Sequence, residues 1–132
     1  MQPGTKGHFE QTVTEALLAK TVGSGSVAVF ATPMMIAGVE RAAAESVQPQ
    51  LAEGQTTVGT RIEMTHEAAT PAGMRVRFET ELVEVSPNGR MLTFHAAAYD
   101  EAGLIGQGIH QRAVVDTARF EAKAAAKFSA GG

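Results

Sequence analysis

The fold depends first on residues 32–47, which read TPMMIAGVERAAAESV. Thr32 is a good N-cap residue and Pro33 suits the first helical position, so a helix is predicted to begin here. At about 100° per residue, one face of this helix gathers six residues, most of them apolar: Met35, Ile36, Val39, Ala43, Ser46 and Val47. The pattern therefore predicts a long amphipathic helix that packs on a core.

Glu40 interrupts the edge of this apolar face, between Ile36 and Val47. A carboxylate seldom leaves water without a partner, because an unpaired buried charge is costly. Two interpretations fit this position. Glu40 is either a general base in a site, or a border residue that reaches water or pairs with a cation of the core.

The composition limits the classes of function. The chain has 132 residues, of which 44% are hydrophobic, and this fits one domain over residues 1–132. It has no cysteine, which excludes thiol nucleophiles, disulfides and thiolate metal sites. Without a signal-like start or a membrane-spanning run, a cytoplasmic protein with no membrane partner is expected. A net charge of -3 and the lack of tryptophan argue against nucleic acid as a partner.

Alternation of apolar and polar residues predicts strands on both sides of this helix. The pair Asn88-Gly89 favours a tight hairpin, so the strands before and after it should pair antiparallel. The order of the predicted elements, a strand, a helix and then four strands, predicts an α+β domain, in which an antiparallel sheet packs one face on a single central helix. The predicted strands cover residues 9–15, 58–66, 74–85, 90–99 and 104–117; residues 23–26 form a flexible loop and residues 119–128 a closing helix.

His66 is predicted to end the strand at residues 58–66, on the same face as Val58, Ile62 and Met64. A lone histidine on an apolar face is more often part of the hydrogen-bonded structure than of a catalytic site. A carboxylate changes this expectation, because it can fix the imidazole tautomer and stabilise the protonated ring. Glu40 and His66 are therefore predicted to act as a pair.

Thr32 has a second interpretation besides capping. A hydroxyl and free N–H groups at a helix start can hold an oxyanion or a substrate carbonyl oxygen. Eight residues of continuous helix would separate Thr32 from Glu40 by about 12 Å. A site that contains both residues therefore needs a later helix start, the length of an acyl group or a second subunit.

Other polar residues give weaker indications. His110 and Arg112 share one face of the strand at residues 104–117, and His95 points to the other side of its own strand. No spacing of His, Asp or Glu matches a metal motif, so no metal is predicted. The glycines at 103, 106 and 108 do not open a helix after a strand, so NAD and ATP are not expected.

Three stretches of the chain resemble the hotdog-fold acyl-CoA thioesterases, and most closely the fluoroacetyl-CoA thioesterase-like family: residues 30–42, residues 59–60 with 65–71, and residues 106–114. The resemblance implies a hotdog fold, with the sheet wrapped around the long helix. It also implies a catalytic set at Thr32, Glu40 and His66, with the backbone of Gly59 near the reacting carbonyl. The implied activity is hydrolysis of a short- or medium-chain acyl-CoA to a free acid and CoA.

The resemblance further implies a homodimer with its sites at the subunit boundary. The acyl chain would lie along the helix, beside Met35, Ile36 and Val39, and Arg112 is the candidate cation for substrate binding. CoA enters only as part of the substrate, so no separate cofactor is expected. The fluoroacetyl-specific enzymes carry an aromatic-rich lid ahead of the threonine, whereas residues 22–29 here are small or aliphatic. An enoyl-CoA hydratase or dehydratase and a non-catalytic acyl-CoA-binding protein are the alternatives.

Overall fold

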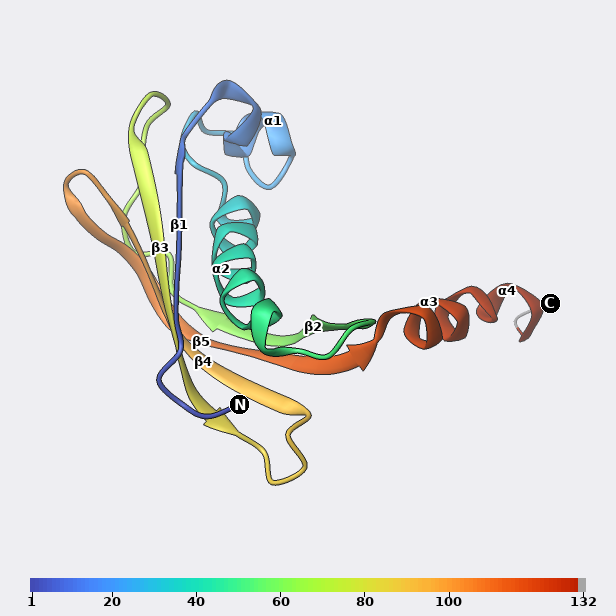
Figure 1. Ribbon diagram of the computed structural model, residues 1–132. Coiled ribbons are helices and arrows are strands. Elements are labelled where there is room, and N and C mark those ends of the chain that lie inside the picture. Colours follow the sequence, from blue (N-terminus) through green and yellow to red (C-terminus); the bar gives the residue numbers. More distant parts are fainter. Residues whose placement is uncertain (131–132) are drawn as a thin grey trace.

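A five-stranded antiparallel sheet curls around one long helix, α2 (Thr32–Val47), in the computed structural model, which describes residues 1–130 (Figure 1). The order of strands across the sheet is β1-β3-β4-β5-β2. The strands are β1 (Lys6–Thr12), β2 (Gln55–Met64), β3 (Arg75–Val85), β4 (Met91–Asp100) and β5 (Gly103–Asp116). The shorter helices are η1 (Glu15–Leu17), α1 (Ala19–Val22), η2 (Gln48–Gln50), α3 (Thr117–Ala125) and α4 (Lys127–Ala130). The predicted α+β architecture is confirmed.

The hairpin of β3 and β4 forms the centre of the sheet. Gly89 has a φ of 74°, a left-handed conformation that glycine adopts without strain, and β3 and β4 pair antiparallel as predicted. Alternate residues of the two strands are buried under α2: Val76, Phe78, Thr80 and Leu82 in β3, and Leu92, Phe94, Ala96 and Ala98 in β4. Glu84 is exposed, because the register shifts between Leu82 and Glu84.

Helix α2 lies directly on the sheet at Gly38. A Cβ atom on Gly38 would overlap the ring of Phe78, so the glycine permits the close approach. Met35 and Val39 are fully buried beside it, whereas Ile36, which the sequence placed on the same face, is half-buried. The helix therefore presents a slightly rotated face to the core, and the small residues decide how closely it packs.

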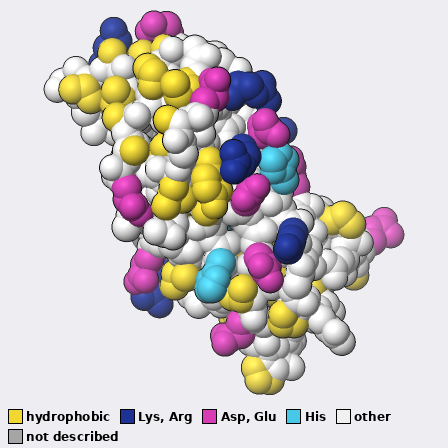
Figure 2. Space-filling model, turned by 90° about the vertical axis from the view of Figure 1, so that its left-hand side faces the viewer, with side chains coloured by type: hydrophobic (Ala, Val, Ile, Leu, Met, Phe, Trp, Pro, Cys, Tyr) yellow, Lys and Arg dark blue, Asp and Glu magenta, His cyan; other side chains and the backbone are white. Residues whose placement is uncertain are grey.

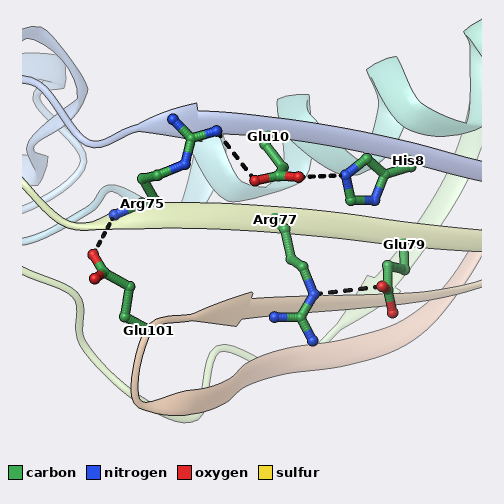
Figure 3. Close-up of polar contacts among 6 residues, drawn as sticks. All are labelled: His8, Glu10, Arg75, Arg77, Glu79 and Glu101. Carbon is green, nitrogen blue, oxygen red and sulfur yellow. Dashed lines mark hydrogen bonds and ion pairs between the residues drawn. The ribbon is translucent and has the colours of Figure 1, made fainter.

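The other face of the sheet carries charged side chains, seen in Figure 2 as basic, acidic and histidine groups intermixed with apolar ones. Figure 3 shows how they neutralise one another: Glu10 lies between His8 and Arg75, and Arg77 contacts Glu79. Exposed pairs of this kind contribute at most about 1 kcal/mol each. The period-two pattern of the strands thus separates a core face from a solvated face.

Three elements have boundaries that differ from the sequence prediction by two residues or more. Strand β1 begins at Lys6, and β2 ends at Met64, so His66 lies in the loop after β2 rather than in the strand. Helix α3 begins directly after Asp116, whose carboxylate accepts a hydrogen bond from the backbone N–H of Arg119 (2.9 Å), and it projects away from the sheet (Figure 1). Within residues 1–130, no helix has the length and apolar character to span a membrane.

Candidate active site

Thr32 and His66 meet at the start of α2. Oγ1 of Thr32 lies 2.7 Å from Nδ1 of His66, so the two groups share a hydrogen bond. Thr32 is not the N-cap that the sequence predicted: Ala31 holds that position, and its side chain makes no capping bond. The threonine hydroxyl is turned toward the histidine, so a tertiary contact replaces the local capping preference.

Backbone hydrogen bonds fix the loop of His66 against β5 and against the segment before α2. The bonds are Thr65 N to Gln107 O (2.9 Å), Glu67 N to Ile105 O (2.6 Å) and Phe30 N to Thr70 O (2.8 Å). Thr70 is fully buried, and its hydroxyl donates to the carboxylate of Asp100 (2.8 Å). His66 therefore has a defined position relative to Thr32, as a reacting group requires.

The second ring nitrogen of His66, Nε2, is buried and has no hydrogen-bond partner within residues 1–130. A buried polar atom without a partner marks a place where a ligand, a water or another chain supplies one. Burial lowers the pKa of His66, so the ring is neutral at pH 7. A neutral imidazole bonded to a hydroxyl is the arrangement of a general base beside a nucleophile or an oriented polar group.

A hollow of about 300 Å³ opens beside this pair, and we call it the Thr32 hollow. The predicted flexible loop contributes to its wall through Ser24 and Gly25, and Val27, which directly follows the loop, also lines the hollow and is 58% exposed. The remaining lining is mostly small or apolar: Ala19, Val29, Phe30, Thr32, His66, Glu67, Ala68 and Ala69. Such a cavity suits a short apolar group with its polar end at Thr32 and His66.

Glu40 has a different partner from the one predicted. Its Oε2 lies 3.6 Å from Nη1 of Arg112, and its side chain is 44% exposed in the single chain. The predicted pairing of Glu40 with His66 is wrong within one chain, because His66 bonds to Thr32 and Glu40 faces Arg112. Of the two interpretations of Glu40, the single chain shows the second, in which the carboxylate pairs with a cation of the core, here Arg112.

Gly59 allows Glu40 to lie against the backbone of β2. A Cβ atom on Gly59 would stand 2.6 Å from Oε2 of Glu40, so a larger residue would displace the carboxylate. The pairing of β2 with β5 shifts between Gly59 and Arg61, which marks a β-bulge. The bulge explains an error in the predicted face of β2, which placed Val58 on the side of the core. Gly59 pairs with buried Arg112 and faces Glu40, so its neighbour Val58 faces the opposite side of the strand.

Arg112 is almost fully buried and holds this region together. Its Nε donates to Oγ1 of Thr57 (2.8 Å), and its Nη2 donates to the carbonyl oxygen of Thr57 (2.9 Å). Burial lowers the pKa of Arg112 and the charge of Glu40 opposes that shift, but a guanidinium stays protonated in a protein. Thr57 was not predicted as a site residue, because the bulge put the sequence pattern of β2 one position out of phase.

His110 completes the network around Arg112. Its Nδ1 lies 2.8 Å from the carbonyl oxygen of Arg61, and its Nε2 lies 3.1 Å from Nη1 of Arg112. A carbonyl oxygen can only accept, so Nδ1 carries the proton and Nε2 accepts from the guanidinium. Burial lowers the pKa of His110, which fits this neutral form. The shared face of His110 and Arg112 was visible in the sequence as their spacing of two residues.

A second hollow of about 290 Å³, which we call the Glu40 hollow, lies over this network. It is lined by Glu40, Gly59, Thr60, Arg61, Ile62 and His110. Of the residues expected beside the acyl chain, Met35 and Val39 have no exposed surface in the single chain, and only Ile36 is half-buried. The candidate residues thus form two groups: Thr32 with His66, and Glu40 with Gly59 and Arg112.

The two groups have the components of acyl-transfer chemistry. Thr32 and His66 supply a hydroxyl and a neutral imidazole with an unpaired nitrogen, and Glu40 supplies a carboxylate beside a fixed cation. Across residues 1–130, no cluster of three or more His, Cys, Asp or Glu side chains is arranged to hold a metal ion.

Comparison with known proteins gives this arrangement a family. The fluoroacetyl-CoA-specific thioesterase family matches residues 13–118. A fluoroacetyl-CoA thioesterase from Streptantibioticus cattleyicolor is 41% identical over 103 residues, which cover 78% of this chain and 73% of that protein. The family match spans α2 and β2 to β5, and therefore both groups of candidate residues.

Solved structures agree in the fold. A fluoroacetyl-CoA thioesterase in complex with fluoroacetate superposes with a TM-score of 0.89 at 32% identity, over 96% of this chain and 98% of that one. A thioesterase superfamily member from Thermus thermophilus gives a TM-score of 0.86 at 29% identity, over 98% and 96% of the two chains. A hot-dog-like protein from Thermanaerovibrio acidaminovorans, 23% identical over 97% and 93%, has the same fold with a TM-score of 0.85. The fold is thus the predicted hotdog fold, and the chain belongs to the fluoroacetyl-CoA-specific thioesterase family.

Proposed function

We propose that this protein is an acyl-CoA thioesterase, which hydrolyses a short- or medium-chain acyl-CoA to a free acid and CoA. The observation that carries the proposal is the 2.7 Å hydrogen bond between Thr32 and His66, with the buried Nε2 of His66 left unpaired beside a hollow. A relative that is 41% identical is named for fluoroacetyl-CoA thioesterase activity, which supports hydrolysis over the other reactions of the fold.

In the proposed mechanism, His66 takes a proton from the attacking group, which is the hydroxyl of Thr32 or a water that Thr32 orients. The thioester carbonyl oxygen lies near the backbone of Gly59, and Glu40 stabilises the charge that develops on His66 or on the water. The carbon–sulfur bond then breaks, and the CoA sulfur leaves as a thiol after it receives the proton from His66. If a water attacks, the free acid forms in this step; if Thr32 attacks, a water then hydrolyses the acyl-threonine ester, which releases the acid and restores the hydroxyl. Thr32, Glu40 and His66 are thus the proposed catalytic residues.

A homodimer is part of the proposal, because one chain separates Thr32 and His66 from Glu40. Strand β2 is an edge strand of the sheet, so its outer side is free to pair with the β2 strand of a second copy. An antiparallel pairing centred near Glu63 would bring the loop of His66 next to the bulge at Gly59 in the partner subunit. Each site would then draw its histidine from one protomer and its glutamate from the other.

The test of function is a thiol-release assay over acyl-CoA chain lengths from acetyl to octanoyl. The proposal predicts stoichiometric CoA and free acid, and activity that is lost in Thr32→Ala. Loss of enone absorbance without thiol release would instead identify an enoyl-CoA hydratase. Binding of acyl-CoA without turnover would identify a binding protein. A CoA-thioester substrate also supports the cytoplasm as the location of the protein.

The dimer arrangement has its own test, because the chain contains no native cysteine. Glu63→Cys introduces one thiol near the proposed two-fold axis, and a short bis-maleimide should join two chains. Glu84→Cys, on the exposed side of β3, is the matched control and should stay unlinked. Equal cross-linking of the two variants would reject the pairing along β2.

A further inference from the structure

A third hollow, of about 200 Å³, lies where α3 leaves the end of β5. We call it the α3 hollow. Its lining combines three cations with apolar side chains: Arg90, Val114, Val115, Asp116, Arg119, Phe120 and Lys123. Phe120 is 45% exposed, so part of its surface is open to a ligand. The hollow is too small to enclose a whole drug-sized ligand, and it suits one end of a longer molecule.

The arginines of this hollow differ from the others in the chain. Of seven arginines, five form an ion pair with a carboxylate, and the other two are Arg90 and Arg119. On the outer face of the sheet, for example, Arg75 and Arg77 are neutralised by Glu10 and Glu79 (Figure 3). Within residues 1–130, the guanidinium groups of Arg90 and Arg119 have no ion pair, and both line the same hollow.

The charge of this region is opposite to that of the chain as a whole. Residues 117–132 contain three cations and one carboxylate, whereas the whole chain has a net charge of -3. Asp116 also lines the hollow, but its carboxylate accepts the hydrogen bond that begins α3. Three cations around an aromatic ring attract an anion that carries a planar group, as a phosphorylated nucleotide does.

We propose that the α3 hollow binds the nucleotide end of CoA, with Arg90, Arg119 and Lys123 on its phosphates and Phe120 under its adenine ring. This proposal rests on the proposed thioesterase function. Arg112, beside Glu40, lies on the same strand as Val115, and three residues of strand span about 10 Å. The extended pantetheine arm of CoA bridges a separation of this size, which places its thioester end at the Glu40 hollow.

The test compares two substrates of the same acyl group. An acyl-CoA carries the nucleotide, and the acyl thioester of pantetheine does not. Arg119→Gln and Lys123→Gln should each raise KM for the acyl-CoA about fivefold with kcat unchanged, and leave KM for the pantetheine thioester as it was. Lys127→Gln removes the same charge two residues beyond α3, outside the hollow, and is the control.

The proposal would be overturned by an equal rise in KM for both substrates, or by the same rise in Lys127→Gln. It would also be overturned if Arg119→Gln or Lys123→Gln changed the molecular mass of the protein in light scattering, because the hollow would then be a subunit contact. Calorimetry with adenosine 3′,5′-bisphosphate separates this proposal from the proposed function. If the wild-type protein releases no thiol from any acyl-CoA, the thioesterase assignment fails. Binding of the bisphosphate that Arg119→Gln weakens then still supports the hollow, and no binding rejects it.

Discussion

The Thr32 hollow and the Glu40 hollow are similar in volume, but different interactions hold their polar side chains in place. In the first, one neutral hydrogen bond joins Thr32 to His66, and backbone bonds hold the loop in place. In the second, a nearly buried guanidinium organises Glu40, Thr57 and His110. The first group leaves a nitrogen unpaired, whereas the three guanidinium nitrogens of Arg112 and both ring nitrogens of His110 each have a partner within 3.6 Å.

This difference divides the candidate site into two halves: a reactive half, Thr32 with His66, and a positioning half, Glu40 with Gly59 and Arg112. We call them the Thr32 half and the Glu40 half. A neutral imidazole with a free nitrogen can accept a proton at pH 7, so the Thr32 half is suited to the chemical step. A carboxylate beside a fixed cation stays ionised and keeps its orientation, so the Glu40 half is suited to stabilise developing charge. The comparison predicts that variants of the two halves fail differently.

The largest effect is expected when either half loses its functional group. His66→Gln and Glu40→Gln should each lower kcat by roughly 10² or more, with little loss of folding, because both keep the side-chain volume approximately. Thiol release and circular dichroism measure the two quantities. Near-normal turnover in either folded variant would remove that residue from the mechanism.

Mixing these two variants sharpens the comparison. If each site takes His66 from one protomer and Glu40 from the other, a mixed dimer keeps one intact site, and subunit exchange should restore roughly a quarter of the wild-type activity. If both residues act within one chain, the mixture stays inactive. A mixture of His66→Gln with Thr32→Ala should give no recovery, because both changes fall in the same half.

Removal of Arg112 is expected to act on stability first. Arg112→Met would leave the carbonyl of Thr57 and Nε2 of His110 without their donor, and we expect the free energy of unfolding to fall by about 3 kcal/mol. Urea denaturation measures the loss. Arg41→Met, which breaks an exposed pair with Glu45, is the control and should cost less than about 1 kcal/mol. Equal losses in the two variants would contradict the anchoring role.

Gly59→Ala tests how closely the Glu40 half must be positioned. The added Cβ would stand 2.6 Å from Oε2 of Glu40, at the far end of a flexible side chain. The side chain can move away, so folding should survive, whereas kcat should fall about tenfold because the carboxylate is misplaced. Unchanged kcat in Gly59→Ala would show that the observed position of Glu40 is not the working one.

The free energy of unfolding should decrease at acidic pH, and histidines of both halves should contribute to this loss. Burial lowers the pKa of His66 and of His110 in the folded state below the value of 6.5 that they have in the unfolded chain. The unfolded state therefore binds more protons below pH 6.5, and stability should fall as the pH decreases from 6.5 through the lowered pKa values. Urea midpoints at pH 7.5 and 5.5 measure this, and His110→Gln should reduce the difference between them. An unchanged difference would show that His110 does not contribute.

The sequence was sufficient where local rules act alone. Period two and the Asn88-Gly89 turn predicted β3 and β4, because the alternation of the chain persists in the fold from Val76 to Leu82 and from Leu92 to Ala98. The face of β2 was wrong at Val58 because a bulge at Gly59 inserts one residue, which no pattern of apolar residues reveals. Thr32 was misassigned as a cap because its partner, His66, is 34 positions away.

The predicted pairing of Glu40 with His66 was wrong within one chain for a related reason. The sequence correctly indicated that this carboxylate needs a partner, but several cations and histidines could supply one. Only the register of β5 on β2 places Arg112 opposite Gly59 and under Glu40. The residue types of a site can therefore be predicted from one sequence, whereas the way they divide into two groups depends on tertiary distances.

The smallest effect of a single change is expected for each methylene group added to the acyl chain that the Thr32 hollow accepts. Its wall contains Val27, Val29 and several alanines, and the loop at residues 23–26 offers no aromatic surface to grip a two-carbon group. Each buried methylene contributes about 0.8 kcal/mol, so kcat/KM should rise about fourfold per methylene from acetyl-CoA to butyryl-CoA. Fluoroacetyl-CoA and acetyl-CoA, which have almost the same size, should react at similar rates. Val27→Ser removes exposed apolar surface at the entrance and should flatten the dependence on chain length. A strong preference for fluoroacetyl-CoA, or activity limited to two-carbon substrates, would show that the absence of an aromatic lid does not set the specificity.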